Sequence, residues 1–107
     1  MRRRTQSIPE QGSREQVLLR RARRHERRGQ GRKAIVAARE ACFLAATDAR
    51  LWAVYASYCW KAGRMPEACD ALRQAIWYRE RSRDRARASV LKGLLSKLER
   101  GLVPNAA

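Results

Sequence analysis

The side chains in this sequence best suited to chemistry are arginines, and three of them recur at helical spacing. Arg20, Arg23 and Arg27 are separated by three and four residues, which places them on one stripe of a helix. A guanidinium group holds a carboxylate or a phosphate through two parallel hydrogen bonds, whereas a lysine ammonium acts as a point charge. The stripe therefore indicates either a binding surface for an anionic partner or a solvated helix face.

The whole chain shares this basic character. Its 107 residues include 25 Lys and Arg against 10 Asp and Glu, for a net charge of +15, and 21 of the 25 basic residues are arginine. Such a chain attracts nucleic acid, anionic lipid or an acidic protein. Arginine and alanine codons are also rich in G and C, so the bias has a second interpretation as the composition of a GC-rich bacterial genome.

Residues for catalysis or metal binding are sparse. The single histidine, His25, has no paired carboxylates beside it for acid–base chemistry, and we expect it to pack or to lie on the surface rather than to form a dyad with a cysteine. Cys42, Cys59 and Cys69 are odd in number and lack a CxxC pair, which argues against a disulfide framework or a zinc site. We predict no enzymatic activity, no cofactor, no metal, and three buried, reduced thiols.

The elements that position these side chains repeat with a period of 34 residues. Gly29 matches Gly63 at that offset, and large apolar residues and alanines match as well. The alanine pairs are Ala22 and Ala56, Ala34 and Ala68, Ala37 and Ala71, and Ala41 and Ala75. The second copy reads Trp52-x2-Tyr55-Ala56-x2-Cys59, then Lys61-Ala-Gly63, Pro66-Glu67-Ala68, Leu72 and Ala75.

This pattern resembles the tetratricopeptide repeat, a helix–turn–helix unit of about 34 residues. The resemblance covers about residues 15–81 and is closest in the second copy. The first copy has Leu18 in place of the Trp and Arg21 where Leu is usual, and Ala46 and Glu80 stand where the family has Pro between repeats. The resemblance implies an all-α fold: a short α-solenoid of two helix–turn–helix pairs.

Local signals predict where the five helices begin and end. Ser13 and Gln16 form a capping box for a helix to about residue 28, and Gly29 precedes a second helix over about 32–46. Thr47-Asp48 caps a third over about 49–62, and Gly63 ends it. Pro66 suits the first turn of a fourth helix to about residue 81. Ser82 is the expected cap of a fifth over about 83–100.

The expected organisation follows from these elements. Residues 1–12 form a disordered basic arm, 13–81 the two repeats (about 15–48 and 49–81), 82–102 a capping helix and 103–107 a tail. The fifth helix carries one apolar stripe, which either covers the last repeat or pairs with a second copy, so we expect a monomer or a weak homodimer. The stripe consists of Val90, Leu91, Leu94, Leu95, Leu98 and Leu102.

In tetratricopeptide proteins the first helix of each pair lines a concave face, and the resemblance assigns binding residues accordingly. Those residues are Gln16, Arg20, Arg23, Arg27, Arg50, Ala53, Ser57, Trp60 and Lys61. Trp60 would face the groove or be half-buried against the fifth helix, while Trp52 and Trp77 are expected to pack. The positions that hold Lys and Asn in chaperone-binding members carry Leu19, Arg23 and Val54, so we reject that function.

These observations favour a protein-interaction module with a basic concave groove for an acidic peptide or partner protein. The alternative is an arginine-rich, nucleic-acid-associated protein that binds the phosphate backbone, and a third hypothesis is a unit that self-assembles through the leucine stripe. No apolar run is long enough to span a membrane, and the basic start Met1-Arg-Arg-Arg4 lacks the apolar segment of a secretory signal. We therefore expect a cytoplasmic protein.

Overall fold

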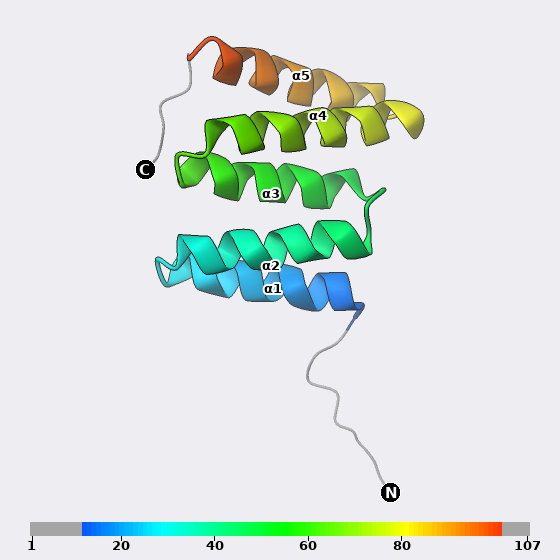
Figure 1. Cartoon of the computed structure of the whole chain (residues 1–107). Coiled ribbons are helices and arrows are strands. Elements are labelled where there is room, and N and C mark those ends of the chain that lie inside the picture. Colours follow the sequence, from blue (N-terminus) through cyan, green and yellow to red (C-terminus); the bar gives the residue numbers. More distant parts are fainter. Residues whose placement is uncertain (1–11, 102–107) are drawn as a thin grey trace, which may run out of the picture.

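Five helices follow one another in the computed structural model, which describes residues 12–101 (Figure 1). They are α1 (Arg14–Arg27), α2 (Gly31–Leu44), α3 (Ala49–Lys61), α4 (Met65–Arg81) and α5 (Arg85–Glu99). Each helix packs against the next one in the chain, and Figure 1 shows them stacked in that order. This part of the chain contains no strand, so the predicted all-α class is confirmed. The predicted tail at 103–107 and nearly all of the predicted arm at 1–12 lie outside the described residues.

The helices α1, α3 and α4 start at the residues that the sequence predicts. The Ser13 hydroxyl accepts a hydrogen bond from the Gln16 backbone N–H at 3.3 Å, and the Gln16 side chain accepts one from the Ser13 N–H at 3.2 Å. At the start of α3, the Asp48 carboxylate accepts from the Arg50 N–H at 3.0 Å. Pro66 lies in the first turn of α4, where its missing N–H leaves no bond unmade.

Three turns, after α1, α3 and α4, share one hydrogen-bond pattern. In each, a residue with positive φ donates to the carbonyl three residues before it at 3.0 Å, and the next residue donates to the carbonyl five residues before it at 2.8 Å. The positive-φ residues are Gly29 (73°), Gly63 (79°) and Arg83 (62°). Glycine adopts this conformation without strain, so Gly29 and Gly63 act as the helix stops that the sequence predicts.

The prediction that Ser82 caps the fifth helix is wrong. Ser82 ends α4, where its hydroxyl donates to the Arg79 carbonyl at 3.0 Å. Arg83 takes the left-handed turn position, and Asp84 caps α5 by accepting from the Arg87 N–H at 3.1 Å. The sequence hides this turn because an arginine stands where a glycine is expected.

Burial repeats between the two helix pairs. Every buried residue of α2 has a buried counterpart 34 positions later in α4. The pairs are Ala34 and Ala68, Ile35 and Cys69, Ala37 and Ala71, Ala38 and Leu72, Ala41 and Ala75, and Cys42 and Ile76. Ala22 of α1 and Ala56 of α3 are buried as well, so all eight alanines that pair at this offset lie in the core.

The three tryptophans differ in environment. Trp52 packs against the core, and its indole N–H donates to the Ala46 carbonyl at 2.6 Å. The expectation that Trp77 packs is wrong, because its side chain is 50% exposed on α4. Its counterpart 34 residues earlier is Phe43, which is 66% exposed on α2. Both rings follow the last buried residue of their helix and so point away from the core.

The cysteines are buried and unpaired, as the sequence predicts. Burial raises the pKa of all three thiols, that of Cys42 to about 12. Within residues 12–101, no group of His, Cys, Asp and Glu side chains is arranged to hold a metal ion. No helix in the same range is both long and apolar enough to cross a membrane.

Candidate binding groove

A groove runs between α3 and α5, with α4 as its floor. One part is an apolar hollow of about 180 Å³. Its lining consists of Ala53, Ala56, Ser57 and Trp60 from α3, Leu72 from α4, and Leu94 and Leu98 from α5. Small residues on α3 leave this space open, because neither alanine nor serine reaches across to α5.

A wider hollow of about 350 Å³ continues the groove toward the start of α3. It shares Ala53 and Ser57 with the apolar hollow and adds Arg50, Val54, Arg79, Arg87, Val90 and Leu91. The two hollows together form the α3–α5 groove. It is apolar along most of its length and carries arginines at one end.

Some residues of the α5 leucine stripe pack against the core, and others line the groove. Ala88 and Leu98 are buried, and Leu91 and Leu95 are half-buried against the α3–α4 core. Val90 and Leu94 stay 71% and 40% exposed and form the groove wall. The helix thus covers α4 and leaves part of its apolar stripe beside α3. Leu102, the last member of the predicted stripe, lies outside the described residues.

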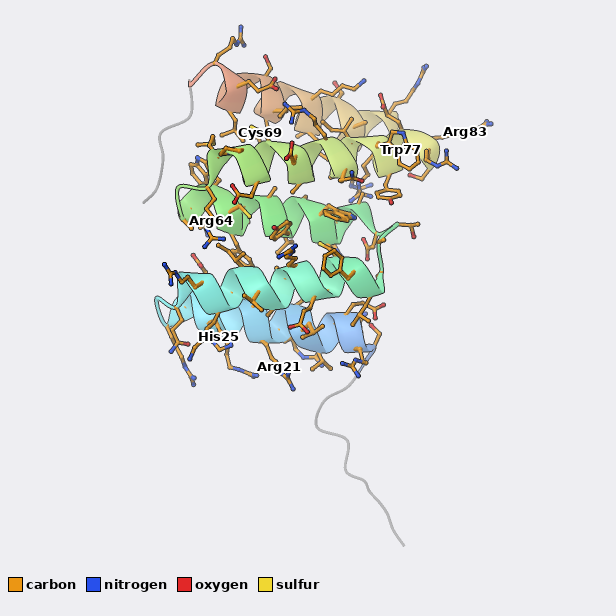
Figure 2. The ribbon with its side chains drawn as sticks, viewed as in Figure 1. Arg21, His25, Arg64, Cys69, Trp77 and Arg83 are labelled. Atoms are coloured by element: carbon orange, nitrogen blue, oxygen red, sulfur yellow. The ribbon has the colours of Figure 1, made fainter. Side chains whose placement is uncertain are left out.

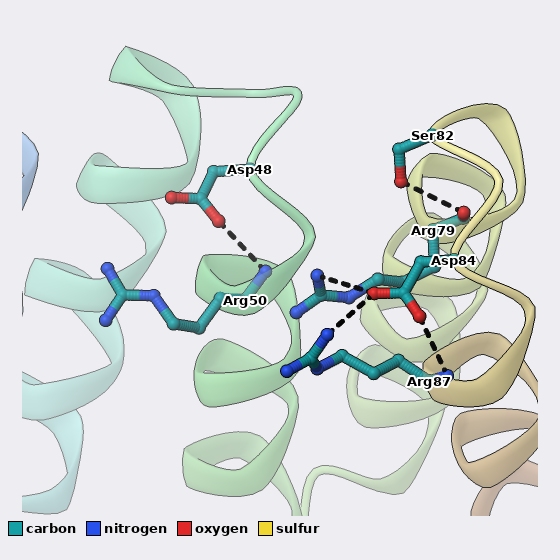
Figure 3. Close-up of polar contacts among 6 residues, drawn as sticks. All are labelled: Asp48, Arg50, Arg79, Ser82, Asp84 and Arg87. Carbon is teal, nitrogen blue, oxygen red and sulfur yellow. Dashed lines mark hydrogen bonds and ion pairs between the residues drawn. The ribbon is translucent and has the colours of Figure 1, made fainter.

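The basic end of the groove is built from three helices (Figure 3). Arg79 and Arg87 both contact the Asp84 carboxylate, at 3.5 and 2.9 Å. Arg50 of α3 is in no ion pair within residues 12–101, and its side chain runs away from the other two in Figure 3. Two of the three arginines that line this hollow therefore share one carboxylate, and the third, Arg50, does not contact it.

Asp84 remains ionised in this setting. Two hydrogen bonds from Arg87 hold the pKa of the carboxyl below its ordinary value of 3.8. The bond from the Arg87 side chain contributes most, and the bond from its backbone N–H contributes next. The Nε atom of Arg79 is buried and has no hydrogen-bond acceptor among the described residues. The positive charge at this end of the groove exceeds what Asp84 neutralises, which favours an incoming carboxylate.

Trp60 meets both sequence expectations at once. Its side chain is partly buried against the cluster that contains Leu72 and Leu98, and it also lines the apolar hollow. Its indole Nε1–H is buried without an acceptor in the described part of the chain. An unmade hydrogen bond of this kind costs about 1–3 kcal/mol.

A separate, smaller hollow of about 140 Å³ lies where the ends of α1 and α3 meet the start of α2. Lys61 forms an ion pair with Glu26 at 3.7 Å, and its Nζ lies 5.9 Å from the centre of the Tyr58 ring. Burial raises the pKa of Tyr58, and the nearby charges of Arg23 and Arg27 lower it in part. These residues form a polar contact between α1 and α3 rather than an apolar groove.

The structure therefore divides the predicted binding residues. Arg50, Ala53, Ser57 and Trp60 lie in the α3–α5 groove, and Arg23, Arg27 and Lys61 lie around Tyr58. Gln16 is committed to the capping box, and Arg20 is exposed on α1. His25 is partly buried, and its Nδ1 lies 2.8 Å from the Gln30 side-chain oxygen, consistent with a packing role at the turn.

Sequence reasoning missed the far wall of the groove. Arg79, Arg87, Val90 and Leu94 all line it, and none of them lies on α1 or α3, where the resemblance places binding residues. The available signal was the width of the leucine stripe, which exceeds what covering one neighbouring helix requires.

Comparisons with protein-family models, with curated proteins and with solved structures found no match for the chain.

Proposed function

We propose that this protein is a non-enzymatic interaction module whose α3–α5 groove binds an acidic segment of a partner protein. The observation that carries the proposal is the continuity of an apolar hollow with an arginine-lined one. Hollows of this kind hold an anchoring side chain, and guanidinium groups hold carboxylates. The proposal places the protein in the cytoplasm, where its three unpaired thiols would stay reduced.

We also propose that the two helix pairs are tetratricopeptide repeats with α5 as their cap. Support comes from the 34-residue match between the buried residues of α2 and α4. The turns at Gly29 and Gly63, with one hydrogen-bond pattern, add to it. In this proposal α3 and α5 supply the walls of the groove.

The groove sets the spacing of the features that a ligand should carry. Arg50 and Trp60 are ten residues apart on α3, so they lie about 15 Å apart along the helix axis. An extended peptide advances about 3.3–3.6 Å per residue, so four to five residues span that distance. The matching segment therefore has a branched apolar residue for the apolar hollow and a carboxylate about four or five residues from it.

The test is fluorescence anisotropy with a labelled peptide that carries Leu and Glu at this spacing. We expect binding that weakens with salt, because exposed charges are screened over about 8 Å at physiological ionic strength. Replacing the leucine by alanine, or the glutamate by glutamine, should each weaken binding.

Variants of the protein locate the site. Ser57→Phe fills the hollow, and Arg50→Gln removes a charge that is in no ion pair among residues 12–101, so each should weaken binding about fivefold or more. Arg21→Gln removes the same charge from the exposed face of α1 and serves as the matched control. Equal loss in Arg50→Gln and Arg21→Gln would mean that only net charge matters. Loss confined to the triple replacement of Arg20, Arg23 and Arg27 by Gln would move the site to α1.

A further inference from the structure

Two exposed aromatic rings recur at the same place in the two repeats, outside the α3–α5 groove. Phe43 on α2 and Trp77 on α4 are 34 residues apart and are 66% and 50% exposed. Figure 2 labels Trp77 near the end of α4. The residues just before them, Cys42 and Ile76, are buried, so the two rings project from equivalent points of equivalent helices. Large aromatic side chains usually bury most of their surface, and their repeated exposure calls for a ligand.

The guanidinium group of an arginine lies over each ring. The Arg39 side chain lies 5.3 Å from the centre of the Phe43 ring, and the Arg81 side chain lies 4.6 Å from that of Trp77. Neither arginine is in an ion pair within residues 12–101. Arg73, by contrast, is held by Asp70 and Glu99. The two outer aromatic pairs, Phe43 with Arg39 and Trp77 with Arg81, thus each combine a flat π surface with an unneutralised charge.

We propose that the outer aromatic pairs bind single-stranded nucleic acid. A nucleotide presents a flat base and a negative phosphate, and each pair offers the matching ring and cation. An acidic peptide would use the guanidinium groups and leave the ring faces uncovered. A second copy of this chain would bring two charges of +15 together.

The spacing of the two pairs suits a short strand. In Figure 1, α3 lies between α2 and α4, so two helix packing distances of about 8–10 Å each separate them. A strand that crosses both pairs therefore covers a few nucleotides, at the low end of the site sizes of about 4–16 nucleotides found for single-strand binding domains. Recognition by stacking and charge alone tolerates any base sequence.

The experiment measures binding of fluorescein-labelled oligothymidylate and oligouridylate of about twelve nucleotides, long enough to cover such a site. We expect both single strands to bind more tightly than a duplex of equal length. Phe43→Ala and Trp77→Ala should each raise Kd about fivefold or more, because stacking on one base contributes at least that much. Phe43→Tyr and Trp77→Phe keep a flat ring and should retain most of the affinity.

Two controls separate stacking from other effects. Leu44→Ala removes a neighbouring side chain that is 50% exposed and carries no guanidinium, so it should leave Kd unchanged. Ser57→Phe blocks only the α3–α5 groove and should also leave it unchanged, so this proposal and the proposed function fail separately. Unaltered affinity in the two alanine variants would overturn the proposal in favour of general charge attraction. Polyglutamate is the competitor that represents an acidic protein. If it displaces the oligonucleotide, and its own binding is lost in Phe43→Ala and Trp77→Ala, the proposal is overturned in favour of an acidic protein partner.

Discussion

Arg83 should be a strained residue whose replacement by glycine stabilises the fold. Its φ of 62° lies in the left-handed region, and it occupies the turn position that Gly29 and Gly63 occupy after α1 and α3. Its side chain is exposed and in no ion pair within residues 12–101, and Figure 2 shows it projecting beyond the end of α4. Arg83→Gly therefore removes strain without removing a described contact.

The magnitude follows from two opposing terms. A left-handed conformation costs an L-residue about 1–2 kcal/mol. Glycine loses more conformational entropy on folding, by roughly 0.5–1 kcal/mol. The free energy of unfolding should therefore rise by about 0.75 kcal/mol, the midpoint of the difference, which for a domain of this size raises Tm by about 3–6 °C. Thermal unfolding followed by circular dichroism at 222 nm, a wavelength that reports helix content, measures the shift.

Arg83→Ala is the matched control, because it removes the same charge but keeps a β-carbon in the left-handed conformation. We expect little stabilisation from the alanine variant. Gly63→Ala, which places a side chain at φ 79°, should lower stability by a comparable amount. Equal Tm values for the glycine and alanine variants would show that relief of charge repulsion, and not of backbone strain, explains the effect.

Three further predictions concern the core, the thiols, and the Asp84 side chain that caps the N-terminus of α5. Ala68→Leu should overpack the core and lower the free energy of unfolding by about 1–3 kcal/mol in urea titrations, whereas Ala86→Leu on the exposed face of α5 should change it little. At pH 8, a thiol reagent should label Cys42 only as the chain unfolds, because burial raises the pKa of this thiol to about 12, and rapid labelling of the native protein would contradict its burial. Asp84→Asn should lower Tm at neutral pH, and the difference should shrink as pH falls below the ordinary value of 3.8. Hydrogen bonds from Arg87 lower the folded pKa of Asp84, so its contribution is present above the unfolded pKa and is lost as the pH falls through the folded one. A pH-independent difference would mean that the cap does not depend on the charge of Asp84.

Local chemistry made most of the helices predictable. The capping box at Ser13, the Asp48 cap and the glycine stops involve residues within a few positions of one another, so their signals are complete in the sequence. The turn before α5 was not predictable in this way, because it places an arginine in a conformation that the chain elsewhere assigns to glycine. The neighbouring serine then resembled a cap although it bonds backwards to Arg79.

The groove was only half predictable, for a different reason. Arg50, Arg79 and Arg87 meet at one hollow although they come from three helices, and no local pattern records that meeting. Trp77 shows a related limit. The buried positions of its helix match those of α2, and Trp77 and its counterpart Phe43 are both exposed. The period locates equivalent residues but does not reveal whether they face the core.

The indole N–H signals of the three tryptophans test the central claim most directly, because each lies in a different environment. In a 15N-edited NMR titration with the Leu–Glu peptide, the Trp60 signal should shift, since its ring lines the α3–α5 groove. The Trp52 signal, tied to the Ala46 carbonyl, and the Trp77 signal, on the outer face of α4, should stay in place. A shift of the Trp77 signal with an unchanged Trp60 signal would contradict the claim that the groove binds the acidic segment.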